Sequence, residues 1–392
     1  MIRTKSLRNG ISAVLAVIAL AFVALVAVGS STGATTSRPA SRATLTARST
    51  TSYRACEVTD TGGINDRSFN ASAYAGLKVA ATAVPGLTYT FLSSTSTSDY
   101  VPNINDFLGE SGTKYCNIIV TVGYDMAAAT YAAAQKNPKR LFTTVDYTYI
   151  KDETPSTPPL PNLLGLHYDT AQDAFLGGYL AAAWSKSGIV GTFGGENIPT
   201  VTIYMDGWVA GVRYYDKLNH KHVSVDGWTP LPGRPMGSLA GSGLFTNDFT
   251  SLNLGKTDAE TLMAEGADVI FPVAGSVGLG AAAAVKAAGA GNVMEWVDTD
   301  GCVSAPQYCP LFLTSVTKGI VASVSAAVEA GAHGTFKGGN YNGTLANNGV
   351  SLSPYHDFAS KIPMSVQDEI NKLKAGIIAG KISVDPESYP VG

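Results

Sequence analysis

Polar and aromatic side chains follow several short apolar runs of this sequence, at the points where each run ends. The first such segment is Asp60-Thr-Gly-Gly-Ile-Asn-Asp-Arg-Ser-Phe-Asn70, and the second is Gly123-Tyr-Asp125. Similar segments lie at 193–197, 245–248, 275–278 and 298–300. Aromatic rings can sandwich a flat heterocycle, an amide both donates and accepts hydrogen bonds, and a carboxylate can accept from both hydroxyls of a vicinal diol. Together these residues predict a site for a flat, polar, uncharged ligand.

The elements that must position these residues are strands alternating with Ala-rich helices. Because the strand-like runs are too apolar to have one face in water, they predict parallel sheets covered by helices. Two successive series of this kind predict an α/β fold with two doubly wound lobes, and ligands of such sheets bind outside the carboxyl ends of the strands. The expected strands are 55–59, 88–92, 117–122, 141–146, 163–168, 189–193, 222–227, 241–245, 269–273 and 293–297. The expected helices are 69–83, 126–135, 171–184, 201–218, 256–264, 279–288 and 365–379.

These elements divide the chain into two expected lobes. The first lobe is expected at 53–165, with a return segment at about 300–335. The second is expected at 166–299, with a C-terminal segment at about 336–392.

The N-terminal segment has the pattern of an export signal. Arg3, Lys5 and Arg8 precede an apolar run at 11–28 that only Ser12 interrupts. Residues 1–29 are therefore expected to be a signal peptide or an uncleaved anchor. Residues 30–52 are rich in Ser, Thr and Ala, which is typical of a flexible linker. The chain is expected to be exported, to the cell surface, a membrane-associated position or the periplasm.

The charge distribution argues against a nucleic-acid partner. The whole chain has a formal net charge of −3, but residues 1–52 contain basic residues and no acidic ones. The rest is therefore more acidic than the total indicates, whereas nucleic-acid binding needs clustered Lys and Arg.

The four cysteines suit an oxidising compartment. Cys302 and Cys309 enclose a short loop and predict a local disulfide. Cys56 and Cys116 each open an expected strand, so a second bridge is expected if these strands are neighbours, and the alternative is two buried free thiols. A metal site is not expected, because there is no C-x-x-C pair and the five His are scattered.

The motif Asp60-Thr-Gly-Gly-x-x-Asp66-x-Ser68-Phe69-Asn70 resembles the signature of the basic membrane protein family of ABC-transporter binding proteins, which includes purine nucleoside receptors. Further segments resemble the family's motifs in the same order, over roughly residues 55 to 385. They are Phe175-Leu-Gly-Gly-Tyr-Leu-Ala-Ala182, Gly194-Gly-Glu-Asn-Ile-Pro199, Gly207-Trp-Val-Ala-Gly211, Gly266-Ala-Asp-Val-Ile-Phe271, Gly275-x-x-Gly-Leu-Gly280, Val297-Asp-Thr-Asp300 and Leu313-Thr-Ser-Val-x-Lys318.

This resemblance implies a type I periplasmic-binding-protein fold whose two lobes are joined by a hinge and close on a purine nucleoside. It also implies a monomer without a cofactor or catalytic activity, which docks on an ABC permease in the membrane. The implied ligand-binding residues are Phe69 and Phe245 for stacking, Asn70 for the base edge, Asp125, Asp298 and Lys318 for the ribose, and Asp60 and Gly275 along the cleft.

The sequence also departs from the family pattern. Glu196 stands where the family has Met, Arg67 replaces a Lys, and Gly301 with the Cys302–Cys309 loop follows Asp300 in place of the usual Gln. The stretch 338–350 is longer and rich in Asn. These changes leave the identity of the ligand open.

Three other functions remain as alternatives. Gly275-x-x-Gly278-x-Gly280, with Asp298 twenty residues after Gly278, partly matches a dinucleotide-binding enzyme, but the glycine spacing differs from G-x-G-x-x-G. A nucleoside-processing enzyme would need an acid/base pair or a metal-activated water. A sensory ectodomain would use the same fold but signal to a membrane receptor.

Overall fold

The structure is a computed structural model that describes residues 52–109, 115–150, 157–239 and 241–389. The expected signal segment at 1–29, and all of the expected linker except Ser52, lie outside the described residues. The described residues form one compact unit.

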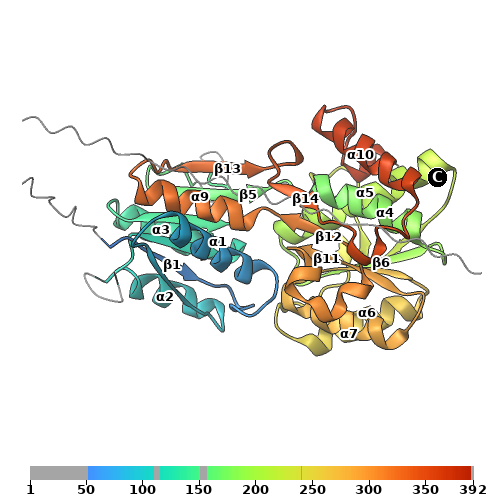
Figure 1. The fold of residues 1–392 in the computed structure, drawn as a ribbon, viewed down its shortest axis with the longest axis horizontal. Coiled ribbons are helices and arrows are strands. Elements are labelled where there is room, and N and C mark those ends of the chain that lie inside the picture. Colours follow the sequence, from blue (N-terminus) through green and yellow to red (C-terminus); the bar gives the residue numbers. More distant parts are fainter. Residues whose placement is uncertain (1–51, 110–114, 151–156, 240, 390–392) are drawn as a thin grey trace, which may run out of the picture. The chain divides into compact units, whose positions relative to one another are not determined.

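The first sheet is parallel and has helices on both faces (Figure 1). In β1, Ala55 packs with the helices on one face, whereas Cys56 packs with those on the other, as the two-residue period of a strand requires. The sheet order is β13-β5-β4-β3-β1-β2, where β1 is Arg54–Val58, β2 Thr88–Leu92, β3 Ile118–Val122, β4 Leu141–Val145, β5 Leu163–Tyr168 and β13 Gly339–Gly343. Helices α1 (Phe69–Ala83) and α9 (Ile320–Ala332) pack on one face, and α2 (Tyr100–Asp106) and α3 (Ala127–Lys136) on the other.

The second sheet repeats this topology. Its order is β14-β12-β11-β10-β6-β7, where β6 is Ile189–Gly194, β7 Ser224–Asp226, β10 Val269–Val273, β11 Val293–Asp298, β12 Phe312–Lys318 and β14 Val350–Leu352. Only β14 is antiparallel to its neighbour within this sheet. The helices of this lobe are α4 (Ala171–Trp184), α5 (Pro199–Asn219), α6 (Leu252–Ala264), α7 (Gly278–Ala288), the short α8 (Gly301–Ser304) and α10 (Met364–Ile378).

The chain passes three times between the two lobes, from β5 to α4, from β12 to α9, and from β13 to β14. The segment that returns to the first lobe therefore begins at α9 and ends with β13, later than the expected 300–335. The reason is that residues 312–318 form β12, which pairs with β11 in the second sheet. The C-terminal portion of the second lobe likewise begins with β14 rather than at 336.

One expected strand is wrong. Of the segment 241–245, only Ser242–Gly243 is extended, as β9, and it pairs with β8 (Trp228–Thr229) in a separate two-stranded sheet. A Cβ atom at Gly241 would lie 1.9 Å from the Trp228 ring, and one at Gly243 would lie 2.5 Å from it. These glycines let the segment lie flat on the indole, and they have no side chains to give to a sheet core.

Both expected disulfides are present. Cys56 lies in β1, and Cys116 immediately precedes β3, the neighbouring parallel strand, so their Cα atoms are 6.0 Å apart. Cys302 and Cys309 close the short loop after β11. The alternative of free thiols at Cys56 and Cys116 is therefore excluded in this structure.

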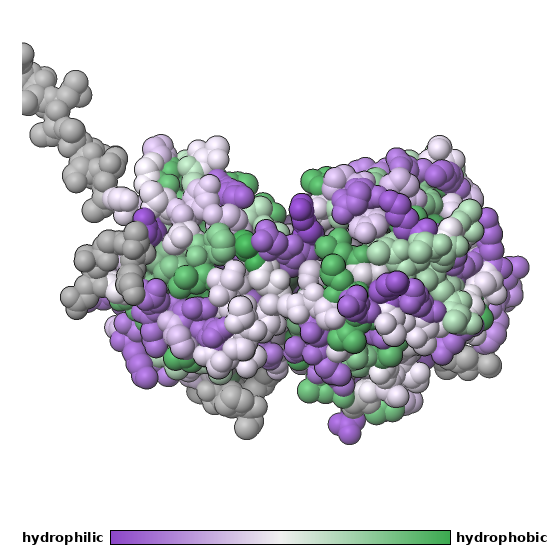
Figure 2. Space-filling view, turned by 90° about the horizontal axis from the view of Figure 1, so that it is seen from below, coloured by the Kyte–Doolittle hydropathy of each residue, from purple (hydrophilic) through white to green (hydrophobic). Residues whose placement is uncertain are grey.

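Hydrophilic residues separate the hydrophobic ones over the face of the molecule shown in Figure 2. No helix among the described residues is both long and apolar enough to cross a membrane.

Candidate functional site

A cavity lies at the carboxyl ends of the strands of both sheets. It encloses about 740 Å³ of empty space, including the open solvent at its mouth. Seven of the eight predicted ligand-binding residues line it: Asp60, Phe69, Asn70, Asp125, Gly275, Asp298 and Lys318. The structure thus brings together residues that are up to about 260 positions apart in the sequence.

Phe245 is the exception, because it is not among the residues that line this cavity. Residue 245 bridges to Gly194, and the space left by this glycine is filled by the Phe245 ring, which would lie 2.6 Å from a Cβ there. The ring also packs edge-on against Trp228. Phe249 lines the cavity instead. Its position depends on the turn after Asp248 and on a hydrogen bond from Ser276 Oγ to the Phe249 carbonyl (2.5 Å), neither of which strand periodicity reveals.

Three polar side chains at the start of α1 form one hydrogen-bonded group. Asn70 donates from Nδ2 to Asp60 Oδ1 (2.7 Å) and to Asp66 Oδ2 (3.0 Å). Its Oδ1 accepts from the Asp60 backbone N–H (3.1 Å). Both protons of the Asn70 amide are therefore used within the protein, and Asn70 fixes the position of Asp60.

Asp60 is the member of this group with an open acceptor. Its Oδ1 accepts from Asn70 and from the Gly62 N–H (2.8 Å), whereas no described group donates to Oδ2. Burial raises the pKa of the Asp60 carboxyl to about 7, although the bonds from Asn70 and Gly62 lower it. The neighbouring carboxylates of Asp66 and Glu196 raise the pKa further. Asp60 can therefore change its protonation state near neutral pH.

A buried ammonium joins carboxylates that end two equivalent strands. Lys318 Nζ lies 2.5 Å from Asp146 Oδ2, just after β4, and 3.4 Å from Asp298 Oδ1, at the end of β11. Both aspartates have left-handed backbones, with φ of 68° and 66°, a conformation that Asp tolerates better than most residues. Burial would lower the pKa of Lys318, but Asp146 and Asp298 raise it above its ordinary value.

The Lys318 ammonium also lies over two aromatic rings. Its Nζ is 4.9 Å from the centre of the Phe69 ring and 5.0 Å from that of Tyr204. The Tyr204 hydroxyl donates to Asp298 Oδ1 (3.3 Å). This part of the cavity is therefore a connected network in which the positive charge is already neutralised.

The family model for "ABC transporter substrate-binding protein PnrA-like" (Bmp) matches residues 54–228 and 245–387. The chain belongs to this family. The resemblance seen in the sequence is thereby confirmed, and so is the coarser function, that of an ABC-transporter substrate-binding protein.

Curated relatives agree with the family, and a solved structure agrees with the fold. The "ABC transporter nucleoside-binding protein BmpA" of Lactococcus lactis subsp. cremoris is 30% identical, covering 85% of this chain and 89% of the relative. "Basic membrane protein A1" of Borrelia garinii subsp. bavariensis is 28% identical, over 84% and 88%. An ABC-transporter solute-binding protein from Aeropyrum pernix K1 has a TM-score of 0.71 at 23% identity, over 84% of this chain and 92% of that one. This structural likeness confirms the two-lobed α/β fold.

The cavity of this Bmp-family chain is also lined by residues that the sequence did not indicate. Tyr100 comes from α2, a helix that was not predicted, and Tyr204 comes from α5, whose apolar periodicity marks it only as a core residue. Glu196 was noted as a departure from the family, and that departure was the available signal for its place in the cavity wall. Thr97, Tyr124, Thr200 and Ser276 also line the cavity.

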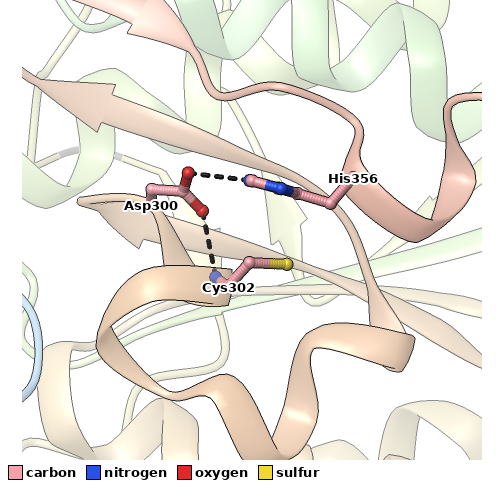
Figure 3. Close-up of side chains that lie close together, drawn as sticks. All are labelled: Asp300, Cys302 and His356. Carbon is pink, nitrogen blue, oxygen red and sulfur yellow. Dashed lines mark hydrogen bonds and ion pairs between the residues drawn. The ribbon is translucent and has the colours of Figure 1, made fainter. Parts of the chain in front are cut away.

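Asp300, Cys302 and His356 lie close together (Figure 3). The Cys302 sulfur is bonded to Cys309, so it is not a thiolate ligand for a metal. Asp300 instead caps α8 by accepting from the Cys302 N–H (3.0 Å) and pairs with His356 Nε2 (2.8 Å). This group fixes the loop that follows Asp298.

Proposed function

We propose that this Bmp-family protein is the exported solute receptor of an ABC importer and binds a purine nucleoside in the cavity between its lobes. The observation that carries the proposal is the chemistry of the cavity. It combines aromatic rings with two carboxylates, Asp125 and Glu196, to which no described group donates a hydrogen bond. Its one lysine, Lys318, is already paired with carboxylates of the protein. The name of the relative from Lactococcus lactis supports the choice of a nucleoside.

The charge of the lining favours a neutral ligand over a phosphorylated one. Six carboxyl side chains line the cavity, against the single ammonium of Lys318. The carboxylates are Asp60, Asp66, Asp125, Asp146, Glu196 and Asp298. A phosphate would meet this excess of negative charge, whereas hydroxyl and N–H groups would find acceptors in it.

The residues divide into two kinds of contact. The Phe69 and Phe249 rings supply flat apolar faces for a base. Asp60 Oδ2 offers an acceptor for an N–H group. Asp125 and Glu196 accept no hydrogen bond from the described protein through their side chains, and they offer acceptors for sugar hydroxyls or base amino groups. Glu196 is half-buried, and burial together with Asp125 and Asp248 raises the pKa of its carboxyl.

A thermal-shift screen of purine nucleosides, free bases, sugars and the matching nucleotides tests the proposal. Stabilisation follows RT ln(1 + [L]/Kd), so a nucleoside bound with micromolar affinity and present at 1 mM should stabilise the protein by about 4 kcal/mol. Nucleotides should produce a smaller shift. A shift by sugars but not by nucleosides would refute the nucleoside, and release of free base would refute a purely binding function.

The membrane partner and location are part of the same proposal. The basic and apolar pattern of residues 1–29 supports export, and membership of an ABC-transporter family supports docking on a permease. Recovery of the protein in the extracytoplasmic fraction, and stimulation of the ATPase of its permease complex by nucleoside, are the expected results.

A further inference from the structure

Ser68 holds a position from which its side chain would ordinarily cap α1. It is the N-cap residue of this helix, yet its hydroxyl makes no capping bond. The hydroxyl is fully buried, and its one proton is shared between two acceptors of the second lobe, the Val297 carbonyl (3.0 Å) and Asp298 Oδ2 (2.8 Å). Since Val297 and Asp298 end β11, this hydroxyl of the first lobe bonds directly to the second.

Asp66 performs the capping that Ser68 does not. Its Oδ1 accepts from the backbone N–H of Ser68 and of Ala71, both at 3.0 Å, and its Oδ2 accepts from the N–H of Asn70 at 2.6 Å. The first turn of α1 is thus satisfied without the serine hydroxyl. The hydroxyl can therefore bond to the other lobe without leaving a backbone N–H of the first turn unsatisfied.

We infer that Ser68 is a positioning residue that holds the Asp298 carboxylate and keeps the lobes closed on the ligand, so that it controls how fast the ligand leaves. The inference rests on the proposed function of the cavity. With Oδ2 held by Ser68, the other oxygen, Oδ1, faces Tyr204 and Lys318. Ser68 acts through Asp298, and it is not itself among the residues that line the cavity.

Hinge opening must break the Ser68 bonds, because their donor and acceptors belong to different lobes. Lys318 also reaches from the second sheet to Asp146 of the first, but it does so where the chain itself crosses, at the step from β12 to α9. No chain crossing links Ser68 closely to β11, because Ser68 is 230 positions from Asp298 in the sequence. The bonds of Ser68 to Val297 and Asp298 therefore depend directly on the closed arrangement of the two lobes.

The test compares Ser68→Ala with Ser72→Ala in the full chain. Ser72 is a matched control, because it is a buried serine of the same helix whose hydroxyl donates to the Ser68 carbonyl, within its own lobe. With adenosine as the probe, stopped-flow fluorescence should show dissociation about tenfold faster for S68A, which corresponds to about 1.4 kcal/mol. S72A should stay within about twofold of the parent, and Ser68→Thr, which keeps the hydroxyl, should restore slow dissociation. Equal dissociation rates for S68A and S72A would overturn the inference.

If the parent protein binds no nucleoside, that result refutes only the proposed function. A second measurement then tests whether Ser68 holds the lobes together. Because all four cysteines are in disulfides, thiols introduced at exposed Val79 on α1 and Leu252 on α6 can be labelled selectively. Electron-spin distances between the labels should become longer and broader in S68A but not in S72A. Unchanged distances in S68A would then overturn the inference.

Discussion

Glu295 should make the stability of the protein fall as the pH rises, and Glu295→Gln should remove that loss. The side chain is fully buried in the second lobe, on the face of β11 covered by α4 and α5. Its Oε2 accepts from Trp208 Nε1 (2.8 Å), whereas Oε1 has no partner among the described residues. Burial raises the pKa of Glu295 from 4.5 to about 8, and the bond from Trp208 lowers it only in part.

The size of the effect follows from this difference in pKa. Because the pKa in the folded state is above that in the unfolded state, the contribution to stability is fully present below about pH 4.5 and is lost as the pH rises through about 8. A difference of about 3.5 pKa units corresponds to about 5 kcal/mol. Gln cannot ionise and keeps an oxygen that can accept from Trp208. The unfolding free energy of E295Q should therefore rise relative to that of the parent by about 1.4 kcal/mol per pH unit from about pH 4.5 to 8.

Urea unfolding of the parent and E295Q at pH 5, 7 and 9 measures this difference. Glu260→Gln is the matched control, since Glu260 is about half exposed on α6 and forms an ion pair with Lys256 on the same helix. E260Q should differ from the parent by only a small amount, because exposed ion pairs contribute little to stability. A difference between E295Q and the parent that is constant from pH 5 to 9 would refute the reasoning.

Three further predictions concern the cavity and the disulfides. Phe249→Ala should weaken nucleoside binding at least tenfold by calorimetry, whereas Phe245→Ala should mainly lower the melting temperature; equal losses of affinity would contradict the assignment of the rings. Removal of the Cys56–Cys116 bridge by replacing both cysteines with Ala should cost about 4 kcal/mol of unfolding free energy in urea, since the bridge closes a loop of 60 residues. If a ligand N–H donates to Asp60, nucleoside affinity should fall about tenfold per pH unit below pH 7, because protonation of Asp60 removes the acceptor; Asp60→Asn should abolish this pH dependence, and a parent profile that is flat from pH 5 to 8 would exclude the contact.

The sequence predicted the sheets well because their strands are continuous apolar runs. Helix 69–83 and strands 88–92 and 163–168 match α1, β2 and β5 at both ends. Helix α2 was missed because Pro and two Asn interrupt its seven residues. Its position places Tyr100 in the cavity.

The identity of the site residues could be predicted better than their roles. Strand ends and the family resemblance together indicated eight residues, and seven of them line the cavity, whereas Lys318 was indicated by the resemblance alone. Which oxygen of Asp60 is open, and where the Asn70 protons go, depend on side-chain torsions that a sequence pattern does not contain. The choice between Phe245 and Phe249 depends on a loop conformation after β9, outside both main sheets.

The equivalence of the two lobes explains why the cavity suits an uncharged ligand. Strands β4 and β11 occupy the same place in the two sheet orders, and each leads into a buried aspartate with a left-handed backbone, Asp146 and Asp298. Lys318 forms ion pairs with both aspartates at a crossing between the lobes. Its charge is therefore neutralised by the protein itself. Replacing Lys318 would leave two buried carboxylates without their partner, and a loss of binding in that variant would mix a lost ligand contact with a disturbed hinge. Ser68→Ala is the more informative variant, because it removes one neutral donor between the lobes and leaves every charged group of this network in place.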